Sequence, residues 1–419
     1  MKRTLLPLAL LIAVTATGWS AEELPVTGTP RPELAAFDAW MQGFLAEHKI
    51  PGASLAIVKD GQLIYARGFG WADRDAKEKV EPESLFRIAS VSKPITAVAI
   101  LKLVDQGKLR LDDKVLDHLK YEPHFEKDGK LDERWKQVTI KHCLTHSGGW
   151  DRDKSYDPMF QAIRMAKSMQ IELPILPEHI IQFQLGQPLD FAPGERYAYS
   201  NFGYSLLGRI IEQVSGQPYH KYVQEEVLKP LGITRARMGG SLIEHRAQDE
   251  VRYYEVNNGE AVAVVGPGAG VKKVPIGYGT WRQETLDSHG GWIASAPDVA
   301  KFAAAFDFQA PDETRSKLLA VQTVRQMFAP AIKMQLPAGS TVKGDRFYGL
   351  GWMIEPVPGD SAVIARHGGA LPCTAASLMH FPNGVNLAVL TNLGQSPDGK
   401  FLGRQIEPPL TELVQKCFP

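Results

Sequence analysis

The sequence lacks several features that would place it in a specialised class of protein. Its 47 lysines and arginines balance 47 aspartates and glutamates, so no net field draws nucleic acid or an anionic membrane to the chain. It contains no internal repeat, no low-complexity tract and no Gly-x-Ser-x-Gly, the turn on which α/β-hydrolases carry their nucleophile. With 419 residues, 44% of them hydrophobic, the composition is that of an ordinary globular protein with a large core.

Cysteine is also scarce in this chain. Cys143, Cys373 and Cys417 are the three thiols, so at most one disulfide can form. A Cys373–Cys417 pair is conceivable in an oxidising compartment, whereas Cys143 is expected to be buried as a small hydrophobic residue. His142, Cys143 and His146 raise the alternative of a metal site, but no glutamate between the histidines and no further ligand accompanies them, so no metal is predicted.

The apolar run at the N-terminus is too short to span a bilayer comfortably. Lys2 and Arg3 precede an apolar stretch over residues 5–14, and small residues follow up to Ser20. This order is typical of a secretory signal peptide, which we predict over residues 1–20; a retained anchor is the alternative. We therefore expect a secreted or periplasmic protein with no stable membrane span after signal cleavage.

Strand patterns stand near both ends of the remaining chain, and helical patterns stand between them. Hairpin signals at Asp60-Gly61 and at Pro382-Asn383-Gly384 each join two strands, and a strand is also predicted over 347–354. Helices are expected over residues 95–104, 141–149, 200–216, 219–232, 295–306 and 408–416, with a looping connection over 258–279. The sequence predicts an α+β fold, in which an antiparallel β-sheet flanked by helices (33–109 and 276–415) carries a second, mostly helical region (110–275).

The stretch RIASVSKPITAVAI, residues 87–100, holds the first candidate site residues. Ser90 and Lys93 are three apart at the start of a buried helix, a spacing that places them on one face within reach of each other. A serine hydroxyl is a weak nucleophile until a base takes its proton, and a lysine kept neutral by burial can do so. The alternative is that Ser90 only caps the helix.

A second candidate is Tyr199-Ser200-Asn201, the only Tyr-x-Asn in the chain, just before a predicted helix. A phenol beside a lysine ammonium can have its pKa lowered and act as acid or base. An asparagine amide can orient both a substrate carbonyl and the lysine. A packed tyrosine and a helix-capping asparagine are the alternative.

The third candidate, His-Gly-Gly, occurs twice, at residues 289–291 and 367–369. Glycines beside a strand let a substrate approach the backbone, whose N–H groups can then form an oxyanion hole. Because the second copy follows a predicted strand, we place His367, Gly368 and Gly369 in the site. The N–H groups of Ala370 and Ser90 are the expected oxyanion donors, and the role of the first copy stays open.

The stretches FRIASVSK, YSNFGYSLLGRIIEQVSGQPY and HGGALPCTAASLMHFPNGVNLAVLTN, in this order, resemble the serine β-lactamase and penicillin-binding-protein superfamily. They look most like its class C β-lactamases, D-peptidases and related esterases, and the resemblance covers roughly residues 33–395. It implies a serine that is acylated and then released by water, with no metal or organic cofactor. It also implies site residues: catalytic Ser90, Lys93 and Tyr199, and substrate-binding Asn201, His367, Gly368, Gly369 and Ala370.

One position departs from the pattern of this superfamily. Many members that act on penicillins have a lysine where this chain has His367, which is charged only below a pKa near 6.5 if unperturbed. Recognition of a carboxylate at neutral pH would then need help from Arg366 or Arg282. This favours an exported serine hydrolase that cleaves a short acyl ester or a D-amino-acid peptide.

Two other functions stay open at this point. One is a β-lactamase, and the other is a penicillin-binding sensor or pseudoenzyme that is acylated without turnover. The expected partner is a small-molecule or peptide substrate, nucleic acid is not expected, and the oligomeric state is left open.

Overall fold

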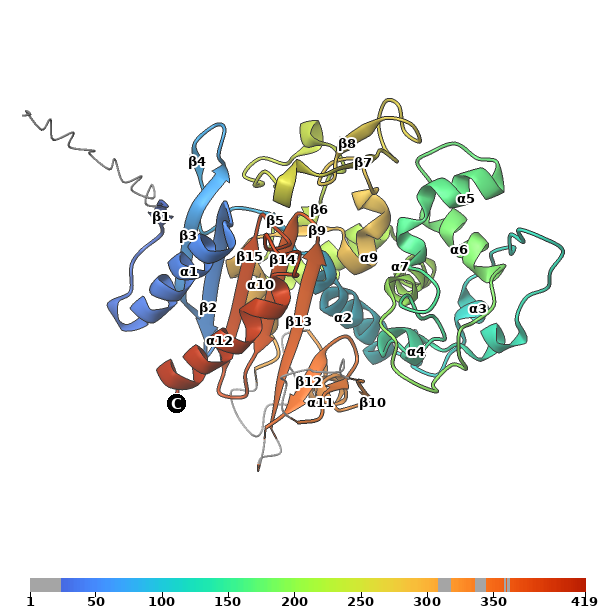
Figure 1. Cartoon of the computed structure of the whole chain (residues 1–419). Coiled ribbons are helices and arrows are strands. Elements are labelled where there is room, and N and C mark those ends of the chain that lie inside the picture. The colour runs from blue at the N-terminus through green and yellow to red at the C-terminus, as the bar shows by residue number, and fades with distance from the viewer. Residues whose placement is uncertain (1–23, 308–317, 336–343, 358, 360–361) are drawn as a thin grey trace, which may run out of the picture.

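In the computed structural model, the described residues are 24–307, 318–335, 344–357, 359 and 362–419. The predicted signal peptide, residues 1–20, lies outside them. Figure 1 shows a sheet with helices on both of its faces and a group of helices beside it. None of the helices in the described ranges is both long enough and apolar enough to cross a membrane.

The large sheet is antiparallel, and it pairs strands from opposite ends of the chain. Its ten strands follow the order β1-β3-β2-β15-β14-β13-β12-β11-β10, with β4 paired to β3. Their bounds are β1 (Val26–Thr27), β2 (Gly52–Lys59), β3 (Gln62–Asp73), β4 (Glu78–Lys79), β10 (Ile332–Lys333), β11 (Phe347–Tyr348), β12 (Met353–Pro356), β13 (Val363–Leu371), β14 (Thr374–His380) and β15 (Val385–Thr391). The pairing of β2 with β15 fixes the N-terminal strands beside the C-terminal ones.

Two smaller sheets complete the strands of the described residues. One has the order β5-β9-β6 and the other pairs β7 with β8. Their bounds are β5 (Phe86–Arg87), β6 (Arg237–Met238), β7 (Glu260–Val262), β8 (Lys273–Pro275) and β9 (Trp292–Ala294). The predicted looping connection over 258–279 therefore contains a short hairpin.

Both predicted hairpins are present in the large sheet. Asp60 and Gly61 join β2 to β3 with φ values of 50° and 75°, the positive values that a tight two-residue turn requires. The strand predicted over 347–354 is instead two strands, because the chain turns between β11 and β12. Gly351 (φ 92°) lies in this turn, where a Cβ would come within 2.4 Å of the Ala97 Cβ.

The helices surround the sheet and build the group beside it. Their bounds are α1 (Ala35–His48), α2 (Ser92–Asp105), α3 (Val115–His118), α4 (Ile140–Leu144), α5 (Ala162–Met169), α6 (Pro177–Leu185), α7 (Asn201–Ser215), α8 (Tyr219–Val223), α9 (Asp287–Gly290), α10 (Ala296–Ala304), α11 (Val321–Phe328) and α12 (Gly403–Cys417). The prediction for α7 is confirmed: the Ser200 side chain accepts the N–H of Gly203, and Gly216 (φ 70°) ends the helix. The sequence prediction missed α1.

Both faces of the sheet are buried. Along β2, Leu55 and Ile57 belong to the apolar cluster beneath α1 and α12, whereas Ala56 and Val58 belong to the larger cluster that includes α2 and α10. This alternation follows from the period of two along a strand. The predicted α+β class, an antiparallel sheet flanked by helices, is therefore confirmed, and the division into residues 33–109 with 276–415 and residues 110–275 stays a prediction.

The helix α2 lies between the sheet and the helical group (Figure 1). Every residue from Ser92 to Leu101 is buried, as the nearly unbroken apolar pattern predicted. The N-terminus of α2 is therefore held from several sides at once, which makes it a rigid place to mount a reactive group.

Candidate active site

Ser90 lies in a short 3-10 turn (Ala89–Val91) that directly precedes α2. Its side chain makes no capping hydrogen bond to either helix, so the alternative of a helix cap is not supported. Ala89 has φ 45°, a left-handed conformation that costs about 1–2 kcal/mol in a residue with a Cβ. Ser90 stays partly exposed, whereas Lys93 is fully buried.

The Lys93 amine is held by three oxygens. Its Nζ lies 2.7 Å from Asn201 Oδ1, 3.0 Å from the carbonyl oxygen of His289 and 3.1 Å from Ser90 Oγ. Burial, and then the charge of Arg152, hold the pKa of Lys93 well below its usual range.

The lowered pKa favours the neutral form of the Lys93 amine, the form that can accept the Ser90 proton. A neutral amine has two N–H groups and one lone pair, and carbonyl oxygens can only accept hydrogen bonds. The two N–H groups are therefore used by Asn201 Oδ1 and the His289 carbonyl. In the structure Lys93 Nζ donates to Ser90 Oγ over 3.1 Å. When the amine is neutral its lone pair can face the Ser90 hydroxyl instead, so Lys93 is placed to take that proton.

Tyr199 makes the second polar contact to Ser90. Its hydroxyl donates a hydrogen bond to Ser90 Oγ over 2.7 Å. Burial raises the pKa of Tyr199 to about 12, so the phenol is protonated at neutral pH. The prediction of a lowered phenol pKa is wrong, because desolvation outweighs the nearby positive charge. Tyr199 is thus placed to give a proton and Lys93 to take one.

Asn201 is oriented by a residue that the sequence analysis missed. Its Nδ2 donates to Asp157 Oδ2 over 2.6 Å, which turns Oδ1 toward Lys93. Asp157 also accepts the N–H of Met159 at the start of a 3-10 turn, and burial raises its pKa. In the sequence, Asp157-Pro158 signals only the start of a turn, so nothing there marks it as a site residue.

Both copies of His-Gly-Gly lie near Lys93, but they contribute different groups. The first copy supplies the His289 carbonyl, which accepts from Lys93. The His289 ring is buried, and its Nε2 has no hydrogen-bond partner in the described part of the chain. The sequence analysis assigned no role to His289, because a residue of any type can offer its backbone carbonyl as a hydrogen-bond acceptor.

The second copy supplies a neutral ring. His367 Nδ1 donates to the carbonyl of Gly368 over 2.9 Å, so Nε2 accepts the hydroxyl of Tyr348, also over 2.9 Å. Burial, and then the charge of Lys93, lower the pKa of His367 to about 3. The ring therefore carries no charge at neutral pH. The pKa of His367 lies further below its unperturbed value than the sequence alone implied.

The arginines named as possible helpers for carboxylate recognition already face acidic groups. The buried Arg366 pairs with Glu355 at 2.7 Å and with Glu407 at 3.6 Å. Arg282 lies 4.0 Å from Glu284. The charge of Arg366 is therefore already paired, whereas the contact of Arg282 is a long one.

A glycine lets β13 approach the turn that carries Ser90. A Cβ at Gly369 would lie 2.2 Å from the carbonyl oxygen of Ile88, a distance that excludes any side chain. Ala370, the next residue along β13, is exposed. The oxyanion role of the Ala370 and Ser90 N–H groups stays a prediction.

His142 and His146 each accept a different backbone N–H. His142 Nδ1 accepts the N–H of Thr139 in the cap of α4, and His146 Nδ1 accepts the N–H of Ser200. The His146 ring packs on Tyr199, with the ring centres 4.4 Å apart. In the described ranges no group of three or more His, Cys, Asp or Glu side chains is placed to hold a metal ion.

The three cysteines are unpaired thiols, so the conceivable Cys373–Cys417 disulfide is absent. Cys143 is buried, as expected. The buried Cys373 lies 3.7 Å from Nη1 of Arg87, and burial raises its pKa to about 11. Cys373 therefore packs against Arg87 as a protonated thiol.

Comparison with known proteins identifies the family of this fold and site. The family model described as Beta-lactamase matches residues 37–407. Protein flp of Staphylococcus aureus (strain COL) is 30% identical over 264 residues, which cover 63% of this chain and 49% of that protein. A putative D-alanyl-D-alanine carboxypeptidase of Escherichia coli (strain K12) is 32% identical over 251 residues, covering 56% of this chain and 55% of that protein.

A solved structure gives the same result for the fold. The octameric penicillin-binding protein homologue from Pyrococcus abyssi superposes with a TM-score of 0.66 at 28% identity, covering 87% of this chain and 74% of that one. The chain spans about half the length of the curated relatives it matches. The predicted superfamily is thus confirmed.

The buried neutral His367 predicts a fold that weakens in acid. Between pH about 6.5 and about 3 the unfolded chain binds a proton at this ring and the folded protein does not. The free energy of unfolding then falls as the pH drops through that window, by up to ~1.4 kcal/mol per pH unit. We expect His367→Gln to reduce this slope by about one proton, measured by urea denaturation between about pH 4 and 6.

The slope, not the absolute stability, is the quantity to compare, because it is insensitive to any packing cost of the substitution. The other buried histidines contribute equally to both proteins. Equal slopes would mean that His367 is protonated in the fold as easily as in the unfolded chain.

Proposed function

The chain belongs to the beta-lactamase family, and on that premise we propose that it is a serine hydrolase that cleaves an ester or amide through an acyl-Ser90 intermediate. The observation that carries the proposal is the pair of contacts to Ser90 Oγ, 3.1 Å from Lys93 Nζ and 2.7 Å from the Tyr199 hydroxyl. Burial lowers the pKa of Lys93, which favours the amine form that takes a proton, and raises the pKa of Tyr199 to about 12, so the phenol keeps a proton to give.

Acylation follows from this arrangement. Ser90 Oγ attacks the carbonyl carbon of the substrate while its proton passes to Lys93 Nζ. The carbonyl oxygen becomes an oxyanion that the N–H groups of Ser90 and Ala370 stabilise. The bond to the leaving group then breaks, the leaving group takes the proton of Tyr199, and Tyr199 recovers a proton from the Lys93 ammonium.

Deacylation reverses these roles with water as the nucleophile. Water attacks the acyl carbon and gives one proton to the Lys93 and Tyr199 pair, which returns a proton to Ser90 Oγ as the acid leaves. Asn201 holds Lys93 from the side and is itself held by Asp157. Lys93 and Tyr199 both contact Ser90 Oγ, and Lys93 Nζ lies 4.8 Å from the centre of the Tyr199 ring, so the proposed proton transfers run between neighbouring groups.

A short acyl ester or a D-amino-acid peptide is the substrate class we favour. The neutral His367 ring offers no charge at the strand position where members acting on penicillins often carry lysine. The carboxypeptidase name of the Escherichia coli relative agrees with a peptide substrate. A dedicated β-lactamase fits this charge distribution less well.

The first test is p-nitrophenol release from a short acyl ester by the mature protein beside its Ser90→Ala variant. We expect steady release that vanishes in the variant, because no other hydroxyl takes the place of Ser90 beside Lys93. Release that survives in the variant would show that another residue is the nucleophile. A single burst of about one equivalent would mean acylation without turnover, the behaviour of a penicillin-binding sensor.

The protonated state of Tyr199 predicts that Tyr199→Phe affects substrates unequally. An amine or alkoxide leaving group needs a proton, whereas p-nitrophenolate departs as a stable anion. We expect the variant to lose about 10²–10⁴-fold in kcat on an amide or alkyl ester and far less on the p-nitrophenyl ester. Equal losses on both substrates would show that Tyr199 acts on attack and not on departure.

We further propose that the chain is exported by residues 1–20. Lys2 and Arg3 ahead of the apolar stretch support this. Expression of the full chain in a bacterium should release a protein into the periplasm or medium that lacks this segment, as intact-mass measurement would show. A product that retains Met1 and stays with the cytoplasm would contradict export.

A further inference from the structure

We propose that Thr96 is a positioning residue for Lys93, because it holds the peptide next to the one that binds the amine. The Thr96 hydroxyl binds the carbonyl of Ser288, and the next carbonyl along the chain, that of His289, accepts the Lys93 amine. The inference rests on the proposed serine hydrolase function, in which Lys93 takes the proton of Ser90. It adds a residue that touches neither Ser90 nor the substrate.

The short helix α9 offers three consecutive carbonyl oxygens to side chains. A helix leaves its last carbonyls without partners inside the helix, and α9 has only four residues. Each of its last three carbonyls accepts a different side-chain donor: Ser288 from Thr96 at 2.6 Å, His289 from Lys93 at 3.0 Å and Gly290 from Gln283 at 3.0 Å. The carbonyl that binds the amine is therefore held in place through both of its neighbours.

A chain of hydrogen bonds directs the Thr96 proton at Ser288. An indole N–H can only donate, so Trp292 Nε1 donates to the Tyr219 hydroxyl over 3.0 Å. Burial raises the pKa of Tyr219, so the phenol keeps its own proton and donates it to Thr96 Oγ1, 2.6 Å away. Thr96 then has one proton to donate, and the Ser288 carbonyl at 2.6 Å is closer than the Ser92 carbonyl at 3.3 Å.

This chain of hydrogen bonds is shielded from water. Thr96, Tyr219, Trp292 and Ser288 are all buried. Water cannot replace a lost donor in such a place, so removal of the Thr96 hydroxyl leaves the Ser288 carbonyl unpaired. The carbonyls of Ser288 and His289 belong to successive peptide units, so a rotation of the first moves the second away from the amine.

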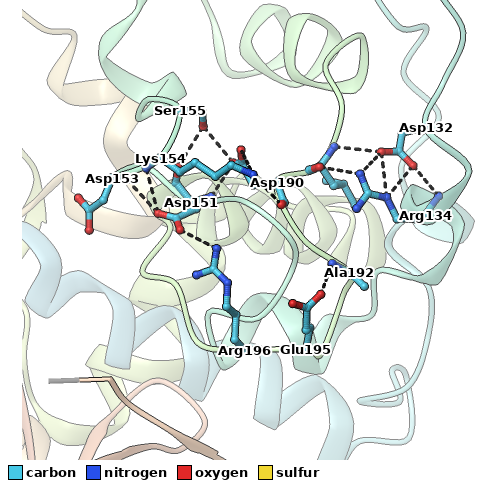
Figure 2. A network of polar contacts seen from close by, with 11 residues as sticks. Asp132, Arg134, Asp151, Asp153, Lys154, Ser155, Asp190, Ala192, Glu195 and Arg196 are labelled. Atoms are coloured by element: carbon cyan, nitrogen blue, oxygen red, sulfur yellow. Dashed lines mark hydrogen bonds and ion pairs between the residues drawn. The ribbon is translucent and has the colours of Figure 1, made fainter.

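The other carbonyl partner of the amine, Asn201, is held by a separate set of contacts. Its Nδ2 donates to Asp157 over 2.6 Å. Figure 2 shows that the segments leading into these two residues are tied together by the ion pair of Asp151 with Arg196, at 2.7 Å. These contacts do not involve Thr96, so a change at Thr96 acts on the other side of the amine.

Several groups besides these carbonyls influence the charge state of Lys93. They are the charged Arg152 and Asp157, the phenols of Tyr199 and Tyr204, and the rings of His146, His289 and His367. In the described part of the chain, the Thr96 hydroxyl has hydrogen bonds only with Ser92, Tyr219 and Ser288. A changed titration of Lys93 in a Thr96 variant is therefore assigned to the His289 carbonyl.

The test is the pH dependence of p-nitrophenyl ester hydrolysis by Thr96→Val, which keeps the shape of the side chain and removes its hydroxyl. We expect kcat to fall about tenfold, the size of one buried hydrogen bond, and KM to stay within about twofold. A carbonyl acceptor stabilises the ammonium more than the neutral amine, so its loss lowers the pKa of Lys93 further. The acid limb of kcat/KM should therefore move to lower pH by about half a unit to one unit.

Three further variants separate positioning from packing. Thr96→Ser restores a hydroxyl at the same place and should recover most of kcat and the wild-type acid limb. Thr96→Ala removes the hydroxyl without adding a methyl group, and its limb should move in the same direction as that of Thr96→Val. Ser92→Ala is the matched control, because it removes a buried hydroxyl of α2 that has no hydrogen-bond partner in the described residues. Its kcat and acid limb should match those of the wild type.

Two results would overturn the inference and leave the proposed function standing, provided that ester hydrolysis depends on Ser90. An unmoved acid limb in Thr96→Val and Thr96→Ala, with urea denaturation showing only lost stability, would assign Thr96 a structural role. An equal shift in Ser92→Ala would show that the limb responds to any change in this helix. Ester hydrolysis that is absent in the wild type, or undiminished in Ser90→Ala, would refute the proposed function and this inference together.

Discussion

The buried amine of Lys93 is the group on which the rest of the site depends. Its three oxygen partners come from the 3-10 turn before α2, the N-terminus of α7 and the end of α9. A polar group that loses its partner in such an environment costs about 1–3 kcal/mol, more if it is charged. The three segments are therefore locked together by one atom, and that atom is also the proposed base.

Burial shifts the pKa values of neighbouring basic and acidic groups in opposite directions. Desolvation lowers the pKa of His367 to about 3 and raises that of Tyr199 to about 12, so both are neutral near pH 7, and it shifts the pKa of Lys93 toward the neutral amine. Removal of water thus produces a base, an acid and an uncharged ring without any ion pair among them. The exposed Arg152 lies over the Tyr199 ring and adds a charge at the edge of this buried group.

The sheet contributes backbone to the site, and the group of helices beside it contributes side chains. The sheet gives rigid backbone: Gly369 in β13 lies against Ile88, and β5 holds the chain that enters the Ser90 turn through its pairing with β9. The helical group gives side chains, with Tyr199 and Asn201 at the start of α7 and Asp157 behind them. Because α2 packs between the two, the reactive groups meet along one helix (Figure 1).

The sequence by itself determined the class of fold and both hairpins, because turn residues and an apolar helix leave direct marks on residue type. The family, and with it the choice of Ser90, Lys93, Tyr199 and Asn201 as site residues, came from the resemblance of three ordered stretches to a known superfamily; the structure brings these four residues together.

Only the tertiary structure decided the protonation states and the supporting partners. The Tyr199 pKa depends on how much water the fold removes, so the lowered value inferred from a neighbouring lysine was wrong. Asp157 and the His289 carbonyl became visible only once distant segments met at Lys93 and Asn201. Burial and long-range contact are properties of the packed chain, and no local pattern of residues encodes them.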